Sequence, residues 1–222
     1  MRRILATFLL MALSCAGCSQ LPPVTPAPVP GKHGPQDVCQ GAFLHTPWQL
    51  YHSITARMPG GQQAVLTGVT IVRPGEGTLR AVLMTLEGLV LFDGEYADRI
   101  VVHRALGPFA RPGFARGLLA DVGMLFVAPR EAPEICGADA RRRLVCRTAL
   151  ARGGWLDITA DPETGWGLTR YNEQRQQERI VTGTPGLETP LARASAITLI
   201  ATGSQSYRLD LKLVDAVPLG QL

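Results

Sequence analysis

Residues 63–94 read QAVLTGVTIVRPGEGTLRAVLMTLEGLVLFDG, and this stretch decides the fold. It contains three apolar runs of strand length, Gln63–Arg73, Thr78–Leu86 and Gly88–Phe92, the last of which closes at Asp93-Gly94, a strong hairpin signal. The first two runs are apolar on both alternating faces, whereas a strand with one solvated face would alternate apolar and polar residues. Both faces are therefore expected to contact apolar material, a core on one side and a helix, lid or lipid on the other.

Strand-like runs continue on both sides of this stretch. Trp48–Met58 precedes it and Arg99–Arg104 follows it. The pattern then returns in the runs Arg143–Leu150, Trp155–Thr159, Gly165–Tyr171, Glu178–Thr182, Ser195–Ala201 and Ser206–Val214. Short strands separated by turn signals predict a mainly β protein of the α+β type, with a curved antiparallel sheet or incomplete β-barrel of about 10–11 strands.

One segment in the middle of the chain has helical periodicity instead. Within Gly113–Val127, the apolar residues Phe114, Leu118, Val122 and Leu125 recur at helical spacing. We expect a central helical insertion here, although Gly117 and Gly123 each weaken a helix by about 1 kcal/mol.

The first residues resemble the leader of an exported bacterial lipoprotein. Met1-Arg2-Arg3 is basic and residues 4–13 are apolar, but this run is shorter than the ~20 residues that a spanning helix needs. It therefore reads as a cleaved signal peptide. Small residues precede both Cys15 and Cys18, as in a lipobox, and Ala16-Gly17 before Cys18 is the commoner pattern. We expect lipidation at Cys18, with Cys15 as the alternative.

These features divide the chain into a signal peptide (residues 1–17), a lipidated N-terminus with a proline-rich tether (18–40) and a single domain (41–222). Leu21–Pro35 is dense in proline and is expected to form an extended spacer, holding the domain about 40 Å from the bilayer. Ser19 and Gln20 place no aspartate after Cys18, which favours the periplasmic face of the outer membrane by resemblance to bacterial sorting rules.

Three cysteines, Cys39, Cys136 and Cys146, remain in the mature chain beyond Cys18, and an exported protein exposes them to an oxidising compartment. Cys136 and Cys146 bracket a short segment, and a disulfide between them is the preferred prediction. Pairing of Cys39 with either one is the alternative. These cysteines form no C-x-x-C pair, so the sequence predicts no zinc site.

The sequence shows no constellation typical of an enzyme. It contains neither a G-x-S-x-G elbow nor a phosphate-binding loop. Glu87, Asp93, Glu95 and Asp98 cluster around the expected Asp-Gly turn, where a solvated hairpin is the more common role. Removal of Arg2 and Arg3 lowers the formal charge from +4 to +2, which gives no indication of nucleic-acid binding. We expect neither catalysis nor a cofactor.

The apolar excess on the strands and the helix suggests instead an aliphatic cavity between them. Acyl chains enter such a cavity because each methylene leaves water. The candidate lining residues are Val65, Val69, Ile71, Val82, Met84 and Leu86 from the strands, with Leu118, Val122 and Leu125 from the helix.

This layout resembles the LolA/LolB group of periplasmic lipoprotein carriers and outer-membrane receptors. The stretches 83–94 (LMTLEGLVLFDG) and 117–122 (GLLADV) are also similar to a group of bacterial outer-membrane lipoproteins of unassigned function that share this fold. The resemblance implies a hydrophobic cavity that binds a lipid acyl chain or a lipidated protein without covalent chemistry, with a periplasmic carrier protein as a possible partner.

Two functions therefore compete. The first is a membrane-anchored protein that binds a lipid or lipoprotein, in lipoprotein localisation or lipid transport. The second is a non-catalytic structural or assembly lipoprotein with a filled core, which binds a protein partner at the outer membrane. An open apolar cavity of about 300 Å³ or more would favour the first, and an exposed apolar patch would favour the second.

Overall fold

The computed structural model describes residues 20–26, 34–58, 60–111, 113–151, 153–203 and 206–220. These residues form one antiparallel sheet of thirteen strands in the order β1-β7-β8-β9-β10-β11-β12-β13-β2-β3-β4-β5-β6. The strands are β1 (Thr25–Pro26), β2 (Trp48–Arg57), β3 (Gln63–Arg73), β4 (Thr78–Met84), β5 (Val90–Tyr96), β6 (Ile100–Ala105), β7 (Ile135–Ala138), β8 (Leu144–Ala149), β9 (Trp155–Asp161), β10 (Gly165–Tyr171), β11 (Gln177–Gly183), β12 (Ala196–Ala201) and β13 (Tyr207–Pro218).

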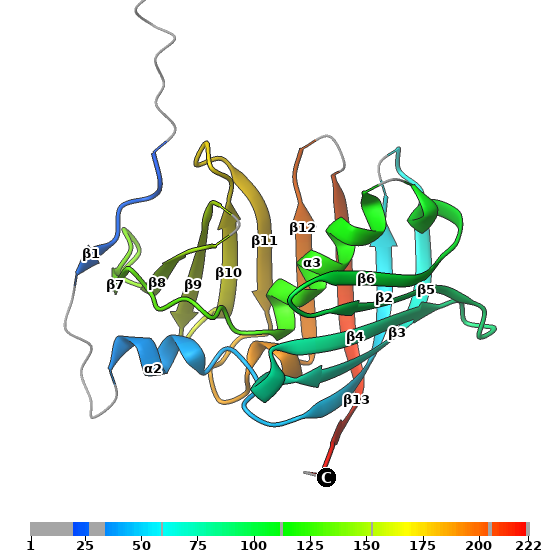
Figure 1. The fold of residues 1–222 in the computed structure, drawn as a ribbon. Coiled ribbons are helices and arrows are strands. Elements are labelled where there is room, and N and C mark those ends of the chain that lie inside the picture. The colour runs from blue at the N-terminus through cyan, green and yellow to red at the C-terminus, as the bar shows by residue number, and fades with distance from the viewer. Residues whose placement is uncertain are drawn as a thin grey trace, which may run out of the picture.

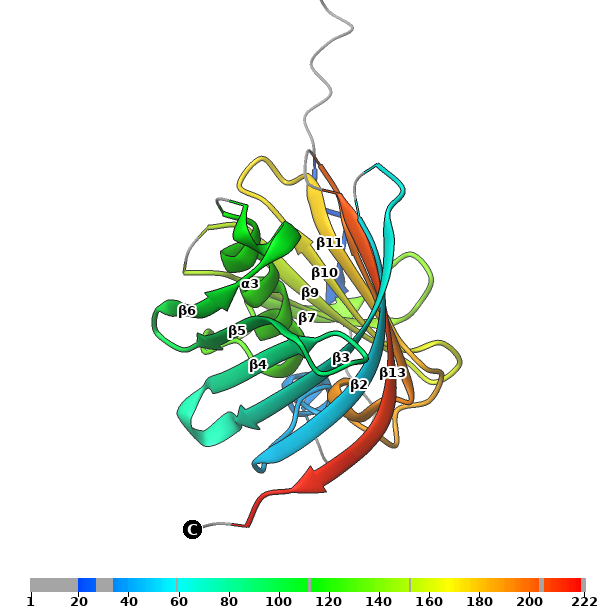
Figure 2. The same cartoon turned by 90° about the vertical axis from the view of Figure 1, so that its right-hand side faces the viewer.

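The sheet is curved and incomplete as a barrel. Its two edge strands, β1 and β6, are the ends of the strand order and do not pair with each other within the described residues. Helix α3 (Phe114–Phe126) lies across the concave face, and the sheet wraps around it (Figures 1 and 2). Shorter helices are α2 (Pro35–Gln40), η2 (Pro74–Glu76), η3 (Gly107–Ala110) and η4 (Leu191–Arg193). The predicted fold class is confirmed.

The predicted helix Gly113–Val127 agrees with α3 to within one residue at each end. Its apolar face packs on the sheet, where Phe92, Phe109, Phe114 and Tyr207 form a chain of rings with centroids 5.8–5.9 Å apart. In the part of the chain that is described, no helix is long and apolar enough to cross a bilayer.

Two strand predictions need correction. The prediction missed β1 and β7, which are two and four residues long and become strands only by pairing with each other and with β8. The Asp93-Gly94 hairpin was also wrong, because both residues lie inside β5. Asp93 instead faces Arg80 of β4 in a bidentate ion pair of 2.8–3.0 Å, and β5 bulges against β6 at this point.

Part of the predicted N-terminal tether, residues 20–26, contacts the sheet. Thr25 and Pro26 pair with Ala138 and Gly137 of β7. In addition, a guanidinium nitrogen of Arg147 donates to the carbonyl oxygen of Pro22 at 2.9 Å. Residues 22, 25 and 26 therefore contact the folded domain directly, and the boundary at residue 41 stays a prediction.

The disulfide joins Cys39 of α2 to Cys146 of β8, so the preferred pairing of Cys136 with Cys146 was wrong. Cys136 and Cys146 are direct cross-strand partners, but Cys136 is a free, half-buried thiol. The observed bond ties the N-terminal segment to the sheet across 107 residues of sequence.

The core contains a buried histidine. His52 of β2 is 2% exposed, its ring lies 6.0 Å from the ring of Phe126, and its Nε2 has no hydrogen-bond partner among the described residues. Because burial disfavours the charged imidazolium, it lowers the pKa of His52 from 6.5 to about 4.

Removal of the observed disulfide should destabilise the domain. We expect Cys39→Ala to lower the free energy of unfolding by about 2 to 4 kcal/mol, because the bond limits the entropy of the unfolded chain. Cys136→Ala is the matched control and should change it by less than about 1 kcal/mol. Urea unfolding measures both values, and an equal effect of the two substitutions would contradict the pairing.

The two glycines inside α3 should respond oppositely to alanine. At Gly117 an added Cβ meets nothing within 4 Å, so Gly117→Ala should stabilise the protein by about 1 kcal/mol through helix propensity. At Gly123 the Cβ would lie 2.6 Å from the ring of Tyr96, so Gly123→Ala should destabilise it by about 1 to 3 kcal/mol. Thermal unfolding of the two variants tests this, and a shift of the same sign in both would refute the packing described for α3.

The stability of the fold should decrease in acid because of His52. Its folded pKa lies below the unfolded value, so no penalty applies above pH 6.5, and the penalty grows as the pH falls towards 4. This group alone should remove about 3 kcal/mol over that range. His52→Leu should lack this part of the decrease in urea titrations at several pH values, whereas a substitution of the exposed His45 to Gln should retain it. Parallel curves for the wild type and His52→Leu would show that His52 does not carry the effect.

Candidate functional site

The strand register brings a row of side chains together on the concave face of the sheet. In an antiparallel sheet, directly opposed residues point to the same face. The register therefore aligns Thr148 of β8, Leu156 of β9, Arg170 of β10, Arg179 of β11, Ala201 of β12 and Tyr207 of β13. This row runs beneath α3 and carries the polar groups of the site.

Helix α3 is joined to this row by one buried carboxylate. Asp121, 1% exposed, accepts a hydrogen bond at 2.7 Å from Nε of Arg179 and another from the hydroxyl of Tyr207. Burial raises the pKa of the Asp121 carboxyl, and the charge of Arg179 opposes this rise. Burial also raises the pKa of Tyr207, as does the neighbouring carboxylate. The interaction fixes the position of α3 over β11 and β13.

On one side of α3, the space beneath the helix is almost filled. The cavity between α3 and strands β2–β5 has a volume of only about 40 Å³ and is strongly apolar. Its walls include Ile54, Leu66, Leu83, Phe92, Leu118, Val122, Leu125 and Phe126. Although enclosed, this space is far too small for an acyl chain in the observed conformation.

The structure places the predicted lining residues in two groups. Leu118, Val122 and Leu125 of α3 line the small cavity. The strand residues lie elsewhere. Val69 pairs with Val82, and the register places both on the same face of the sheet as Asp93 and Arg104. Thr70, which lines the cavity, lies on the opposite face. The other strand residues of the prediction are Val65, Ile71, Met84 and Leu86. They line neither this small cavity nor the larger one described below.

The choice of face was therefore wrong for β3 and β4. Val65 is 46% exposed, and Leu86 is 68% exposed in the turn between β4 and β5. Leu66, Thr70, Ala81 and Leu83 occupy the concave face instead. Because both faces of these strands are apolar, the sequence carries no signal that distinguishes the concave face from the convex one.

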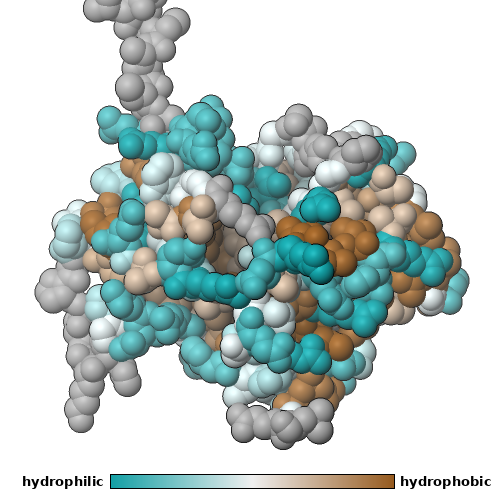
Figure 3. Space-filling model, viewed as in Figure 1, coloured by the Kyte–Doolittle hydropathy of each residue, from teal (hydrophilic) through white to brown (hydrophobic). Residues whose placement is uncertain are grey.

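A larger cavity opens on the other side of α3. It has a volume of about 330 Å³ and forms a hollow near the centre of the face that carries the helix (Figure 3). We call it the α3 groove. It is lined by Gly77, Tyr96, Ala97, Asp98, Ala120, Met124, Val127, Ala128, Pro129, Arg130, Glu131, Leu150, Ala151, Leu156 and Arg170.

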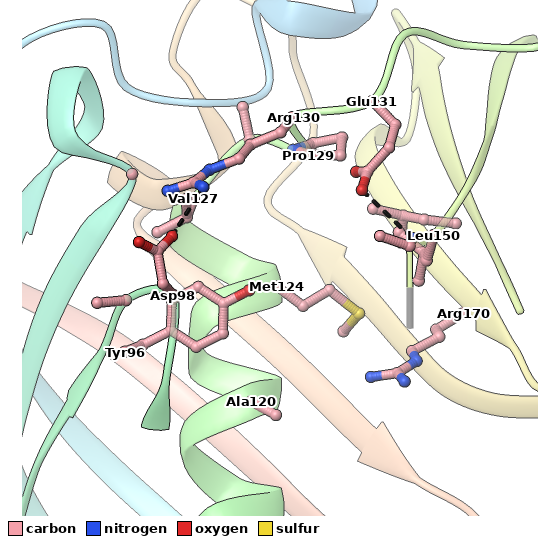
Figure 4. Close-up of a pocket in the computed structure, with 15 residues that line it drawn as sticks. Tyr96, Asp98, Ala120, Met124, Val127, Pro129, Arg130, Glu131, Leu150 and Arg170 are labelled. Atoms are coloured by element: carbon pink, nitrogen blue, oxygen red, sulfur yellow. Dashed lines mark hydrogen bonds and ion pairs between the residues drawn. The ribbon is translucent and has the colours of Figure 1, made fainter. Parts of the chain in front are cut away.

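The α3 groove has polar side chains at its rim and apolar ones inside. At the rim, Arg130 forms an ion pair with Asp98 at 2.8 Å, and Glu131 accepts from the backbone N–H of Ala151 at 3.2 Å (Figure 4). Met124 and Leu156 contribute apolar surface between the helix and β9. The arrangement suits an amphipathic ligand better than a small polar one.

Three acidic residues of the cluster predicted around residues 87–98, Asp93, Glu95 and Asp98, form ion pairs. Asp93 pairs with Arg80, which lowers the pKa of the Asp93 carboxyl through their hydrogen bonds, and Glu95 lies 3.3 Å from His103. No group of three or more His, Cys, Asp or Glu residues that could hold a metal occurs within the residues described. The predicted lipidation site, Cys18, lies outside them.

Sequence reasoning missed Asp121, Arg179, Tyr207 and Arg170. Asp121 is among the most buried residues of α3. It is the one acidic residue of this mostly apolar helix, which is the available signal, and this signal does not identify its partners.

The sequence matches no protein-family model and no curated protein. The structure, however, is similar to that of a LolA superfamily protein from Nitrosomonas europaea, at 9% identity and a TM-score of 0.50, over 85% of this chain and 93% of that one. A putative outer membrane lipoprotein-sorting protein domain from Vibrio parahaemolyticus aligns over 85% of this chain and 92% of its own, at 10% identity and a TM-score of 0.49. The similarity to the Nitrosomonas europaea protein indicates a LolA/LolB-like fold.

Proposed function

We propose that this protein is a lipoprotein of the periplasmic face of the outer membrane, anchored through Cys18, which binds the acyl chain of a lipid or a lipidated protein. The leader pattern before Cys18 supports export and lipidation, with residues 1–17 removed. The LolA-like fold supports a carrier or receptor role without covalent chemistry. The single observation that carries the proposal is the open α3 groove of about 330 Å³.

The volume and the lining of this groove agree with an acyl ligand. Its volume lies at the lower end of small-molecule sites, which span about 300 to 1000 Å³. Each methylene that enters would contribute about 0.8 kcal/mol by leaving water. The ion pair of Asp121 holds α3 in place, so the ligand would enter beside the helix and not beneath it.

The packing of residues 20–26 supports a position close to the membrane. Gln20 begins the described segment and follows Cys18 by two residues. Two extended residues span at most about 7 Å, so an acylated Cys18 would lie within that reach of Gln20. The domain would then sit at the bilayer surface, where lipid cargo enters or leaves.

A second candidate has one observation in its favour. Leu86 and Leu89, which is 52% exposed, project from the turn between β4 and β5, and an exposed apolar turn can contact a protein partner. This surface favours the structural or assembly lipoprotein described above.

Native mass spectrometry of the chain extracted in a neutral detergent tests the proposal. We expect a mature protein that begins at an acylated Cys18 and carries a non-covalent lipid, which dissociates on collisional activation. Ala120→Phe places a large side chain in the groove and should reduce lipid occupancy at least tenfold. Ala196→Phe, at an exposed position on β12, is the matched control and should retain the lipid.

Two results would reject acyl binding in the groove. One is a wild-type protein free of lipid after expression in several hosts, which would leave the second candidate as the better explanation. The other is equal lipid occupancy in Ala120→Phe and Ala196→Phe. A protein that retains residues 1–17 without acylation would reject the anchor alone.

A further inference from the structure

Arg170 places a positive charge at the α3 groove. It lies opposite Leu156 of β9 and Arg179 of β11 in the register, and therefore on the concave face. Its guanidinium group points towards α3, near Ala120 and Met124 (Figure 4). A cation in this position faces a cavity whose nearest walls are apolar.

The hydrogen-bonding capacity of Arg170 is incompletely used within the described structure. Its Nε is buried and has no hydrogen-bond partner among the described residues. The nearest carboxylate oxygen, from Glu178, lies 3.8 Å from this nitrogen, which is beyond hydrogen-bond distance. A half-buried guanidinium with an unpartnered Nε–H favours an anion that can accept from it.

Two further carboxylates near the groove bond to groups other than Arg170. Asp121 accepts from Arg179 and Tyr207, although it still attracts Arg170 at longer range. Asp98 is paired with Arg130 at the rim. Asp121, the fully buried acid beside these arginines, thus forms its close contacts with Arg179 and Tyr207, and Arg170 keeps only the longer ion pair with Glu178 at 3.8 Å.

The rest of the α3 groove has the character expected for a hydrocarbon tail. Met124, Val127, Leu150 and Leu156 provide apolar surface between Arg170 and the rim. A ligand with its head at Arg170 could place its chain along these side chains, so that both parts of an amphiphile would find matching surroundings.

We infer that the α3 groove binds an acyl amphiphile with an anionic head, a carboxylate or a phosphate, and that Arg170 selects the head. This inference rests on the proposed acyl binding and adds the charge of the ligand. The guanidinium donates to the anionic oxygens, as arginine commonly does to carboxylate and phosphate groups.

Titration of the purified full-length protein with three ligands of equal chain length tests the inference. The ligands are laurate, dodecyl phosphate and dodecanol, added in neutral detergent and read by native mass spectrometry. We expect the wild type to prefer at least one of the anions over dodecanol by about tenfold to a hundredfold, the usual range for a hydrogen bond to a charged group. The ratio of laurate to dodecyl phosphate identifies the head.

Variants separate the charge of Arg170 from its packing. Arg170→Gln should reduce the anion preference to about threefold or less, whereas Arg170→Lys should retain part of it because the positive charge remains. Arg116→Gln removes an exposed arginine on α3 outside the groove and should retain the full preference. With carboxyl-labelled laurate, the NMR titration of the bound carboxyl should also move to lower pH in the wild type than in Arg170→Gln.

The outcomes distinguish this inference from the proposed function. Equal binding of dodecanol and both anions by the wild type would overturn the role of Arg170 while acyl binding stands. An anion preference that persists in Arg170→Gln would assign head recognition to another residue and would also overturn the inference. Binding of none of the three ligands would reject the proposed acyl site itself.

Discussion

The arrangement of the concave face depends on the hydrogen bonds that the buried carboxylate of Asp121 accepts. This carboxylate joins α3 to Arg179 of β11 and Tyr207 of β13, two strands that are separated by β12. The helix is thereby held at one position across the hollow of the sheet. A nearly filled apolar space results on one side of α3 and the open α3 groove on the other.

Apolar contacts alone would not determine this position, because hydrophobic burial has no preferred direction. A charged hydrogen bond does have one, and it specifies both the rotation of the helix and its place along the strands. Such a buried pair contributes little net stability, since the loss of hydration offsets most of the attraction. The pair instead sets the positions of side chains. Asp121 bonds to Arg179, whereas Arg170, which is opposite Arg179 in the register, faces the groove.

The N-terminal segment is held from both faces of the sheet. Arg147 and Cys146 are neighbours on β8, so their side chains point to opposite faces. Arg147, paired with Asp157 at 2.6–2.7 Å, holds Pro22 on one face, and Cys146 holds α2 on the other. Pro22 and α2 are therefore both attached to the same strand, β8.

The sequence by itself determined the strands from β2 to β6 and from β8 to β13, the single helix α3 and the open antiparallel architecture, because alternating or helical apolar spacing is a local consequence of burial. It also predicted Leu118, Val122 and Leu125 on the apolar face of α3. Only the tertiary structure decided that Thr70, and not Val69, faces the helix, that Cys146 bonds to Cys39, and that Asp121 is buried with Arg179 and Tyr207. The contacts of Asp121 with Arg179 and Tyr207 join residues 58 and 86 positions apart, and the disulfide joins residues 107 positions apart. A local sequence pattern contains no information about which distant strand will lie beside it.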